Sequence, residues 1–374
     1  MMTKRNGENP ERDISPSLRE ALGECDLLVG REQLDYFYEL YDPRTGGFYY
    51  SISSRDSAEM TPFAEGTCFV IEALLAGGMT LPDWYREKVS DWVLGHQDPE
   101  DGFFYEELWG KITSEKPGAR LYRDLAFSEG ILEYCGNIKP RYPLPSERIK
   151  KNPDEVKSNA ALPEYLESPE KMTAFLDSLD WSTRSIWGTG QTLGMAADLI
   201  RSAGLYDTVY EYVKSKQNRD TGLWGEGLGW MNTNGAMKLS HFFLDRDHVY
   251  PNPERAVESV LRLFADYPPP EYATYLWNPF VLLSRILATA EREEELRELI
   301  SSKGAETVRL AVRTAMRMHR SDGGFSSGID HATPHQQGYI FGLGLKDESD
   351  LDGTLIAGVR LRNIIYSVYG EEPK

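Results

Sequence analysis

Six places in the sequence put a polar side chain beside a small or turn-forming residue. They are Glu65-Gly66, Glu129-Gly130, Gly190-Gln191, Asn234-Gly235, Asn278-Pro279 and Asp352-Gly353. Three of the polar side chains are carboxylates, and glycoside cleavage needs one carboxylic acid to protonate the leaving oxygen and one carboxylate to activate water or attack. Glu65, Glu129 and Asp352 are therefore candidate catalytic residues, with Asp124 about one helical turn before Glu129.

Amide and aromatic side chains near the same places are candidates for substrate binding. The amides are Gln191, Asn234 and Asn278, and the aromatic side chains are Tyr122, Trp187, Trp224, Trp230 and Trp277. Aromatic faces stack on sugar rings and line pockets for prenyl chains, but they also pack the turns between helices. Plain helix capping is the alternative for the polar side chains, because Asp, Asn and Glu favour helix N-termini.

Four short runs organise the chain around these residues. They are Thr45-Gly46-Gly47-Phe48, Asp101-Gly102-Phe103-Phe104, Thr221-Gly222-Leu223-Trp224 and Asp322-Gly323-Gly324-Phe325. The first two lie about 56 residues apart, and the later gaps of about 120 and 101 residues are near twice that spacing. Glycine permits a tight turn, and the aromatic residue can pin that turn between two helices. The spacing indicates a repeat with degenerate copies.

The apolar periodicity predicts six pairs of one outer and one inner helix, and thus an all-α (α/α)6 barrel, or toroid. The inner helices are expected at residues 61–76, 124–134, 190–203, 232–243, 278–290 and 350–369. We expect a mobile tail over residues 1–14, a single domain over 15–374, and a long loop excursion at about 137–169. Because the inner N-termini of a toroid point to one mouth, the six polar side chains are predicted to ring its central cavity.

Charge and composition limit the partners. A net charge of -18 argues against nucleic acid and anionic membranes, since both require a basic surface. The three cysteines, Cys25, Cys68 and Cys135, show no CxxC spacing and favour a reducing compartment. The polar N-terminus carries no apolar signal region, so we expect a soluble, cytoplasmic protein that takes a small molecule or an oligosaccharide. The sequence indicates no cofactor and leaves the oligomeric state open.

The Asp101-Gly102-Phe103-Phe104 run, with Gln97 before it, and the Asp322 run resemble the repeats of the terpenoid cyclase/protein prenyltransferase toroid superfamily. The segment Asp350-Leu351-Asp352-Gly353-Thr354 is similar to the DxDD motif of class II terpene cyclases. That resemblance implies a proton-donor role for Asp352, although Gly353 replaces the last Asp of the motif. The Asp-x-Cys zinc motif of prenyltransferases does not occur in the sequence. Asp330, His331 and His335 could bind a metal, but we favour hydrogen bonding within a loop and predict no metal site.

A looser resemblance connects the runs at Asp42–Phe48 and Asp220–Trp224 with (α/α)6 glycoside hydrolases of the unsaturated-glycuronyl type. The leading hypothesis is accordingly a carbohydrate-active enzyme, either a glycoside hydrolase or lyase-like, that works with the acids at the cavity mouth. A terpenoid-cyclase-like enzyme with Asp352 as general acid is the first alternative. A non-catalytic toroid that binds a ligand or a protein is the second.

Overall fold

The computed structural model describes residues 14–112, 119–159, 161–245 and 247–373. Within these residues the chain is helical apart from turns and one short hairpin, made of β1 (His335–Gln336) and β2 (Tyr339–Ile340). The predicted tail, residues 1–14, lies outside the described residues except for Ile14. No helix in the described ranges combines the length and the apolar character that crossing a membrane requires.

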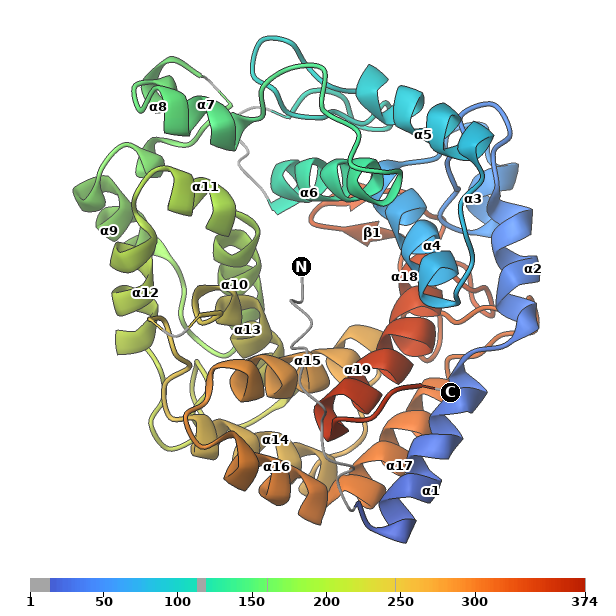
Figure 1. The fold of residues 1–374 in the computed structure, drawn as a ribbon, viewed down its shortest axis with the longest axis vertical. Helices are drawn as coiled ribbons and strands as arrows, with labels where there is room; N and C mark the ends of the chain where they lie inside the picture. The colour runs from blue at the N-terminus through green and yellow to red at the C-terminus, as the bar shows by residue number, and fades with distance from the viewer. Residues whose placement is uncertain (1–13, 113–118, 160, 246, 374) are drawn as a thin grey trace.

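The inner helices form a closed ring (Figure 1). They are α4 (Ala64–Ala76), α6 (Ala119–Tyr134), α10 (Ile186–Met195), α13 (Trp230–Leu239), α15 (Ala273–Thr289), and the last inner segment, made of α18 (Leu351–Gly353), a π-helical stretch Thr354–Arg360 and α19 (Leu361–Tyr369). Each packs on the next, and the π-helical stretch contacts both α15 and α4, which closes the ring. The predicted (α/α)6 toroid is thus confirmed.

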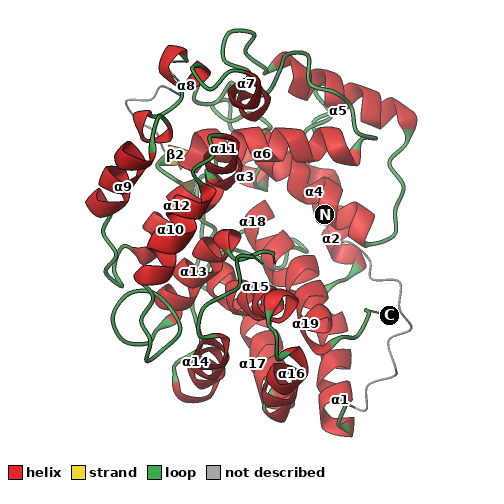
Figure 2. Cartoon of the chain, turned by 60° about the vertical axis from the view of Figure 1, so that its left-hand side comes forward, coloured by secondary structure: helices red, strands yellow, loops and turns green. Residues whose placement is uncertain are grey.

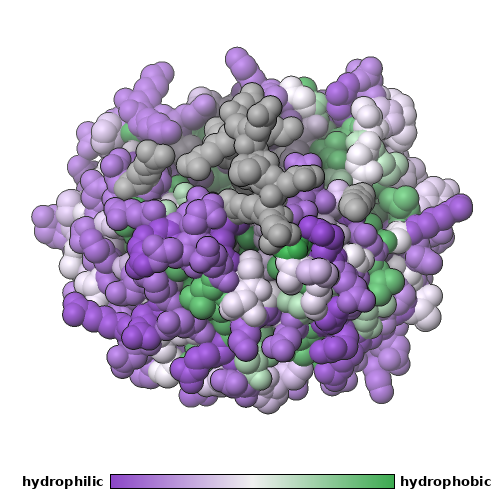
Figure 3. Space-filling view, turned by 60° about the horizontal axis from the view of Figure 1, so that its bottom comes forward, coloured by the Kyte–Doolittle hydropathy of each residue, from purple (hydrophilic) through white to green (hydrophobic). Residues whose placement is uncertain are grey.

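The outer helices surround this ring and cover its apolar outer side (Figures 1 and 2). They are α1 (Pro16–Glu24), α2 (Arg31–Leu40), α5 (Asp83–Gly95), α9 (Pro169–Ser178), α12 (Tyr206–Ser215), α14 (Pro253–Asp266), α16 (Glu293–Ser302) and α17 (Gly304–Met316). The shorter helices are α3 (Ile52–Asp56), α7 (Pro145–Lys151), α8 (Glu155–Ser158) and α11 (Ala197–Ser202), with 3-10 turns at Cys25–Leu28, Glu164–Leu166 and Ser240–Phe242. The outward face in Figure 3 is largely hydrophilic, with scattered apolar side chains.

The four Gly-aromatic runs form equivalent turns. Their glycines Gly46, Gly102, Gly222 and Gly323 all have positive φ, between 67° and 95°. The aromatic residue that ends each run is buried, and Trp224 and Phe325 are fully so. Gln97 and Gln217 precede two of the turns, and each side-chain amide donates to the carbonyl of the turn glycine. A repeated local geometry therefore underlies the repeated sequence.

The segment predicted as a loop excursion is partly helical. Residues 137–169 contain α7, α8 and the Glu164–Leu166 turn. Pro145 occupies the first turn of α7, where its missing N–H needs no partner, and Ile149 and Val156 are buried beneath these helices. The high content of proline and charged residues concealed these short amphipathic elements.

Candidate functional site

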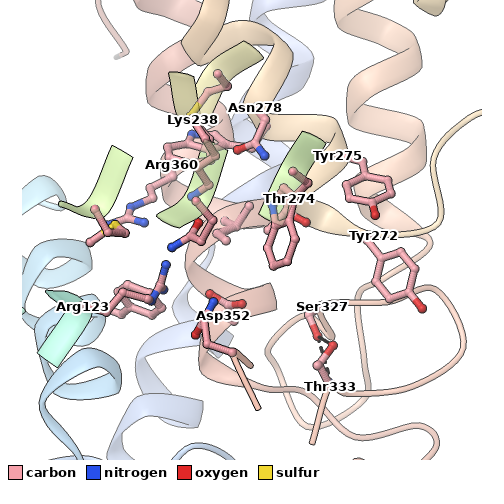
Figure 4. A pocket seen from close by; sticks show the side chains of 18 of the residues that line it. Arg123, Lys238, Tyr272, Thr274, Tyr275, Asn278, Ser327, Thr333, Asp352 and Arg360 are labelled. Carbon is pink, nitrogen blue, oxygen red and sulfur yellow. Dashed lines mark hydrogen bonds between the residues drawn. The ribbon is translucent and has the colours of Figure 1, made fainter. Parts of the chain in front are cut away.

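A cavity of about 550 Å³ lies at the centre of the ring (Figure 4). Its volume is within the range of pockets that bind small organic molecules. The apolar and aromatic part of its wall consists of Phe69, Phe127, Trp187, Met195, Met237, Tyr272, Tyr275, Trp277 and Ile356. The polar part includes Arg123, Gln191, Lys238, His241, Asn278, Arg285, Asp352 and Arg360. Asp352 is the single carboxylate among the described lining residues.

Asp350 holds the backbone that presents Asp352. Its Oδ1 atom accepts the Gly353 N–H at 2.6 Å, which caps α18. Its Oδ2 atom accepts the N–H of Ser327 at 2.9 Å and that of Thr333 at 3.2 Å. Burial, and then the neighbouring Asp352 carboxylate, raise the pKa of Asp350 to about 6. Of the two acids in the motif, Asp350 therefore fixes the local backbone, whereas the side chain of Asp352 faces the cavity.

Gly353 is required by close packing. A Cβ atom at this position would lie 2.2 Å from the Ser326 carbonyl carbon and 2.3 Å from the Ser327 nitrogen. Such distances to backbone atoms cannot be relieved by a side-chain movement. The departure from the DxDD pattern thus follows from the approach of the 326–327 backbone to α18.

Restoring the motif by Gly353→Asp is expected to destabilise the protein by about 3 kcal/mol or more, because the overpacked backbone must move. Thermal or denaturant unfolding measures the effect. The matched control is Gly188→Ala in α10, where an added Cβ meets no atom within 4 Å and should stabilise the helix slightly. Equal stability of Gly353→Asp and the wild type would contradict this packing argument.

Four cationic side chains line the cavity, and two of them have acidic partners. Arg123 pairs with Glu65, and Arg360 forms a two-pronged pair with Glu72 at 2.7 and 2.5 Å. The guanidinium of Arg360 also lies 4.9 Å from the centre of the Phe69 ring. Lys238 and Arg285, the other two cations, have no acidic partner within 4 Å among the described residues.

Two predicted acids, Glu65 and Asp124, lie behind the cavity wall in a buried ion network. Glu65 binds Arg120 at 2.6 Å and also pairs with Arg123. Asp124 accepts from the Arg120 side chain at 2.8 Å and from Trp109 Nε1 at 3.0 Å. Arg120 is fully buried, and Glu65 is 2% exposed. These contacts hold α4 and α6 together and leave neither acid in the cavity lining.

The other predicted site residues are divided between the cavity and the interior of the wall. Gln191, Asn278, Trp187 and Trp277 line the cavity with Asp352. Glu129 lies in a separate pocket of about 230 Å³ beside Asp198, where burial raises its pKa to about 7. The remaining predicted residues do not line the cavity. Asn234 accepts a hydrogen bond from Asn278, and the hydroxyl groups of Tyr122 and Tyr165 share one. The indole N–H groups of Trp224 and Trp230 donate to the backbone carbonyls of Val213 and Pro268.

The predicted ring of polar residues at the inner-helix starts is therefore wrong for most members. Only Glu65 and Asp352 lie in the first turn of an inner helix. Glu129, Gln191, Asn234 and Asn278 lie further along, because α6, α10, α13 and α15 begin at Ala119, Ile186, Trp230 and Ala273. Extended backbone at Gly229 and Tyr272 sets the starts of α13 and α15.

Sequence reasoning missed the cations. Arg123, Lys238, Arg285 and Arg360 each lie on an inner helix or on the π-helical stretch, and none was considered as a site residue. A charged side chain in the middle of an otherwise apolar inner segment was the available signal. The loop residues Asp330, His331 and His335 belong to no cluster of three or more potential metal ligands among the described residues.

The sequence matches no known protein family, and no curated protein is significantly similar to it. Solved structures similar to this chain include a variant of the type II terpene cyclase MstE from Scytonema in complex with its product merosterolic acid A, at 13% identity and a TM-score of 0.43. Another is an MstE variant in complex with its substrate geranylgeranyl dihydroxybenzoate, at 12% identity and a TM-score of 0.47. A protein from Actinoplanes is 13% identical, with a TM-score of 0.44. Each alignment covers 94% of this chain and 99% of the other.

The leading hypothesis of a carbohydrate-active enzyme is wrong. Glycoside cleavage requires two carboxyl groups that face one bond, and the described cavity lining contains only Asp352. Glu65 and Asp124 are neutralised by arginine behind the wall. The cavity lining likewise gives no support to the resemblance to glycoside hydrolases or to an oligosaccharide substrate.

Proposed function

We propose that this protein is a terpenoid-cyclase-like enzyme that protonates an alkene of an isoprenoid substrate through Asp352. The observation that carries the proposal is the composition of the cavity, whose lining combines one buried carboxyl group with many aromatic and aliphatic side chains. An apolar wall suits a hydrocarbon chain, and the faces of Trp187 and Trp277 can stabilise a carbocation.

The neighbouring acids supply the proton. Burial, and then the neighbouring Asp352 carboxylate, disfavour the ionisation of Asp350. Asp350 consequently holds a proton up to about pH 6, next to the proposed donor Asp352, whereas a single exposed Asp would have lost it. In the reaction the O–H bond of Asp352 breaks, the proton bonds to one alkene carbon, and the other alkene carbon becomes the cation.

A second alkene of the substrate then attacks the cation, which forms a carbon–carbon bond and closes a ring. Loss of a proton from a neighbouring carbon to water or to the Asp352 carboxylate forms a new alkene. Substrate and product are therefore isomers, and no redox partner is needed. The apolar part of the cavity wall shields a cation formed against it from water on that side.

Reaction in D2O tests this proposal directly. Purified protein is incubated with farnesol, geranylgeraniol, their diphosphates and a prenylated phenol, and the products are analysed by mass spectrometry and NMR. Protonation predicts a cyclic isomer that carries deuterium on the carbon protonated first. A product without deuterium, or release of the head group without a new ring, would rule out protonation-initiated cyclisation.

A further inference from the structure

Two helices bring into the cavity a pair of cations that form no ion pair with the described residues. Lys238 extends from α13, and Arg285 extends from the neighbouring α15. The Arg285 side chain is held by the Met237 carbonyl and the Ser240 hydroxyl, both at 2.8 Å. No hydrogen bond or ion pair joins the Lys238 amine to any described residue. This pair therefore differs from Arg123 and Arg360, whose charges Glu65 and Glu72 offset.

Helix α10 is packed closely against α13 at Lys238. A Cβ atom at Gly190 of α10 would lie 2.9 Å from the Lys238 Cβ, and one at Gly194 would lie 2.7 Å from the Lys238 carbonyl oxygen. These glycines bring the α10 backbone against α13. Next to Gly190 is Gln191, which lines the cavity and is 2% exposed. Neither the nitrogen nor the oxygen of its side-chain amide has a hydrogen-bond partner in the described part of the chain.

His241 adds a neutral acceptor for Arg285. Its Nε2 atom lies 3.3 Å from the Arg285 Nη2 atom. Burial, then Arg285 and Lys238, lower the pKa of His241 well below its ordinary value. The neutral ring can thus fix the guanidinium without adding a charge. Lys238, Arg285 and Gln191 form a polar group whose hydrogen-bonding capacity is incompletely used within the protein.

We propose that Lys238, Arg285 and Gln191 bind the anionic head group, phosphate-type or carboxylate, of the isoprenoid substrate. The proposal deepens the proposed function and rests on it for the isoprenoid chain, but not for the anion. A charge-assisted hydrogen bond to a buried cation is stronger than a neutral one, and an unfilled buried donor is unfavourable. Figure 4 shows Lys238 and Asp352 lining the same cavity, so a head group bound at Lys238 would hold the chain in the cavity that contains the acid.

The protonation of Lys238 supports the same assignment. Burial, followed by the charges of Arg123 and Arg285, lowers the pKa of Lys238 to about 7. The charged groups that face its amine are Arg123 on α6, Arg285 on α15, and Asp352 and Arg360 on the last inner segment. An anion bound here favours the charged amine and raises its pKa. Binding at pH 8 should therefore take up protons, up to about one for each ligand.

Calorimetric titration of the Asp352→Asn protein tests the head-group site without turnover. The probes are farnesyl diphosphate, farnesoic acid, farnesol and inorganic diphosphate, and the first two distinguish a phosphate-type from a carboxylate head group. At least one anionic probe should bind about tenfold or more tightly than farnesol. Titration in two buffers of different ionisation enthalpy should reveal the proton uptake at pH 8. Equal binding of farnesol and both farnesyl anions would overturn the proposal.

Adding Lys238→Met to the Asp352→Asn protein is expected to weaken anion binding about tenfold to a hundredfold and to abolish proton uptake. Farnesol affinity should stay the same. The unliganded Lys238→Met protein should melt no earlier than its parent, because a desolvated charge without an ion-pair partner is removed. Lys157→Met on exposed α8 is the matched control. Unchanged anion affinity in the Lys238→Met variant would reject the site, whereas anion binding without ring formation in the wild type would reject only the cyclase function.

Discussion

Replacing Asp352 with Asn is expected to slow ring formation about a thousandfold or more, because the proposed reaction begins with the proton of this side chain. General acids contribute roughly a hundredfold to ten-thousandfold to enzymatic rates, and no other described carboxyl group lines the cavity. The Asn side chain has nearly the same size and keeps a polar group in the same place. The measurement is the rate of product formation in a single turnover with excess enzyme.

The control for this variant is Asp330→Asn, the same exchange at an exposed acid that does not line the cavity. It should leave the rate within about twofold of the wild type, as expected for an exposed side chain away from the site. Substrate affinity, measured calorimetrically, should persist in Asp352→Asn, which separates loss of chemistry from loss of binding. Ring formation at the wild-type rate in Asp352→Asn would require another proton source and would refute the role of this residue.

The pH dependence of the rate follows from the same pair of acids. The raised pKa of Asp350, about 6, means that the folded protein holds a proton that exposed carboxyl groups would release near pH 4. Asp352 must be protonated to act as the acid, so the rate should be highest at low pH and fall toward tenfold per pH unit once its proton is lost. A rate that rises with pH through this window would instead indicate a general base.

The fold could be predicted because its signals are local. The turn glycines have positive φ, and the aromatic residue that ends each run is buried in every copy. These features are repeated in the sequence at visible spacing. The starts of the inner helices were harder to place. Gly229 and Tyr272, the residues before α13 and α15, have extended backbone and make no side-chain capping hydrogen bond, so no capping residue in the sequence marks these starts.

The site was only partly predictable because its chemistry depends on pairs formed between helices. Asp352 was found from a motif, and Gln191 and Trp187 from their position near an inner-helix start. Nothing local distinguishes the ion-paired Glu65 from the cavity-facing Asp352, since the difference is made by Arg120 and Arg123 on another helix. A sequence reading that treats each acid alone will assign both to the site.

Replacing Glu65 with Gln is expected to destabilise the protein by about 3–5 kcal/mol. Glu65 is the acidic partner that Arg120 and Arg123 share, and the amide would leave part of their charge uncompensated in a region where Arg120 is fully buried. Removing one partner of a buried ion pair is costly because the remaining charge cannot reach water. Chemical denaturation monitored by circular dichroism measures the free energy of unfolding.

The matched control is Glu20→Gln, which removes a carboxylate from an ion pair with Arg309 at the surface, where the Glu20 side chain is 73% exposed. Its effect should be below about 1 kcal/mol, because water screens the surface pair. Equal effects of the two variants would mean that the Glu65 network is open to solvent and is not part of the wall. A Glu65→Gln protein that is fully stable but catalytically inactive would mean that Glu65 takes part in the reaction. Lost stability, with residual ring formation by the folded fraction, would mean that Glu65 holds α4 against α6 beneath the cavity.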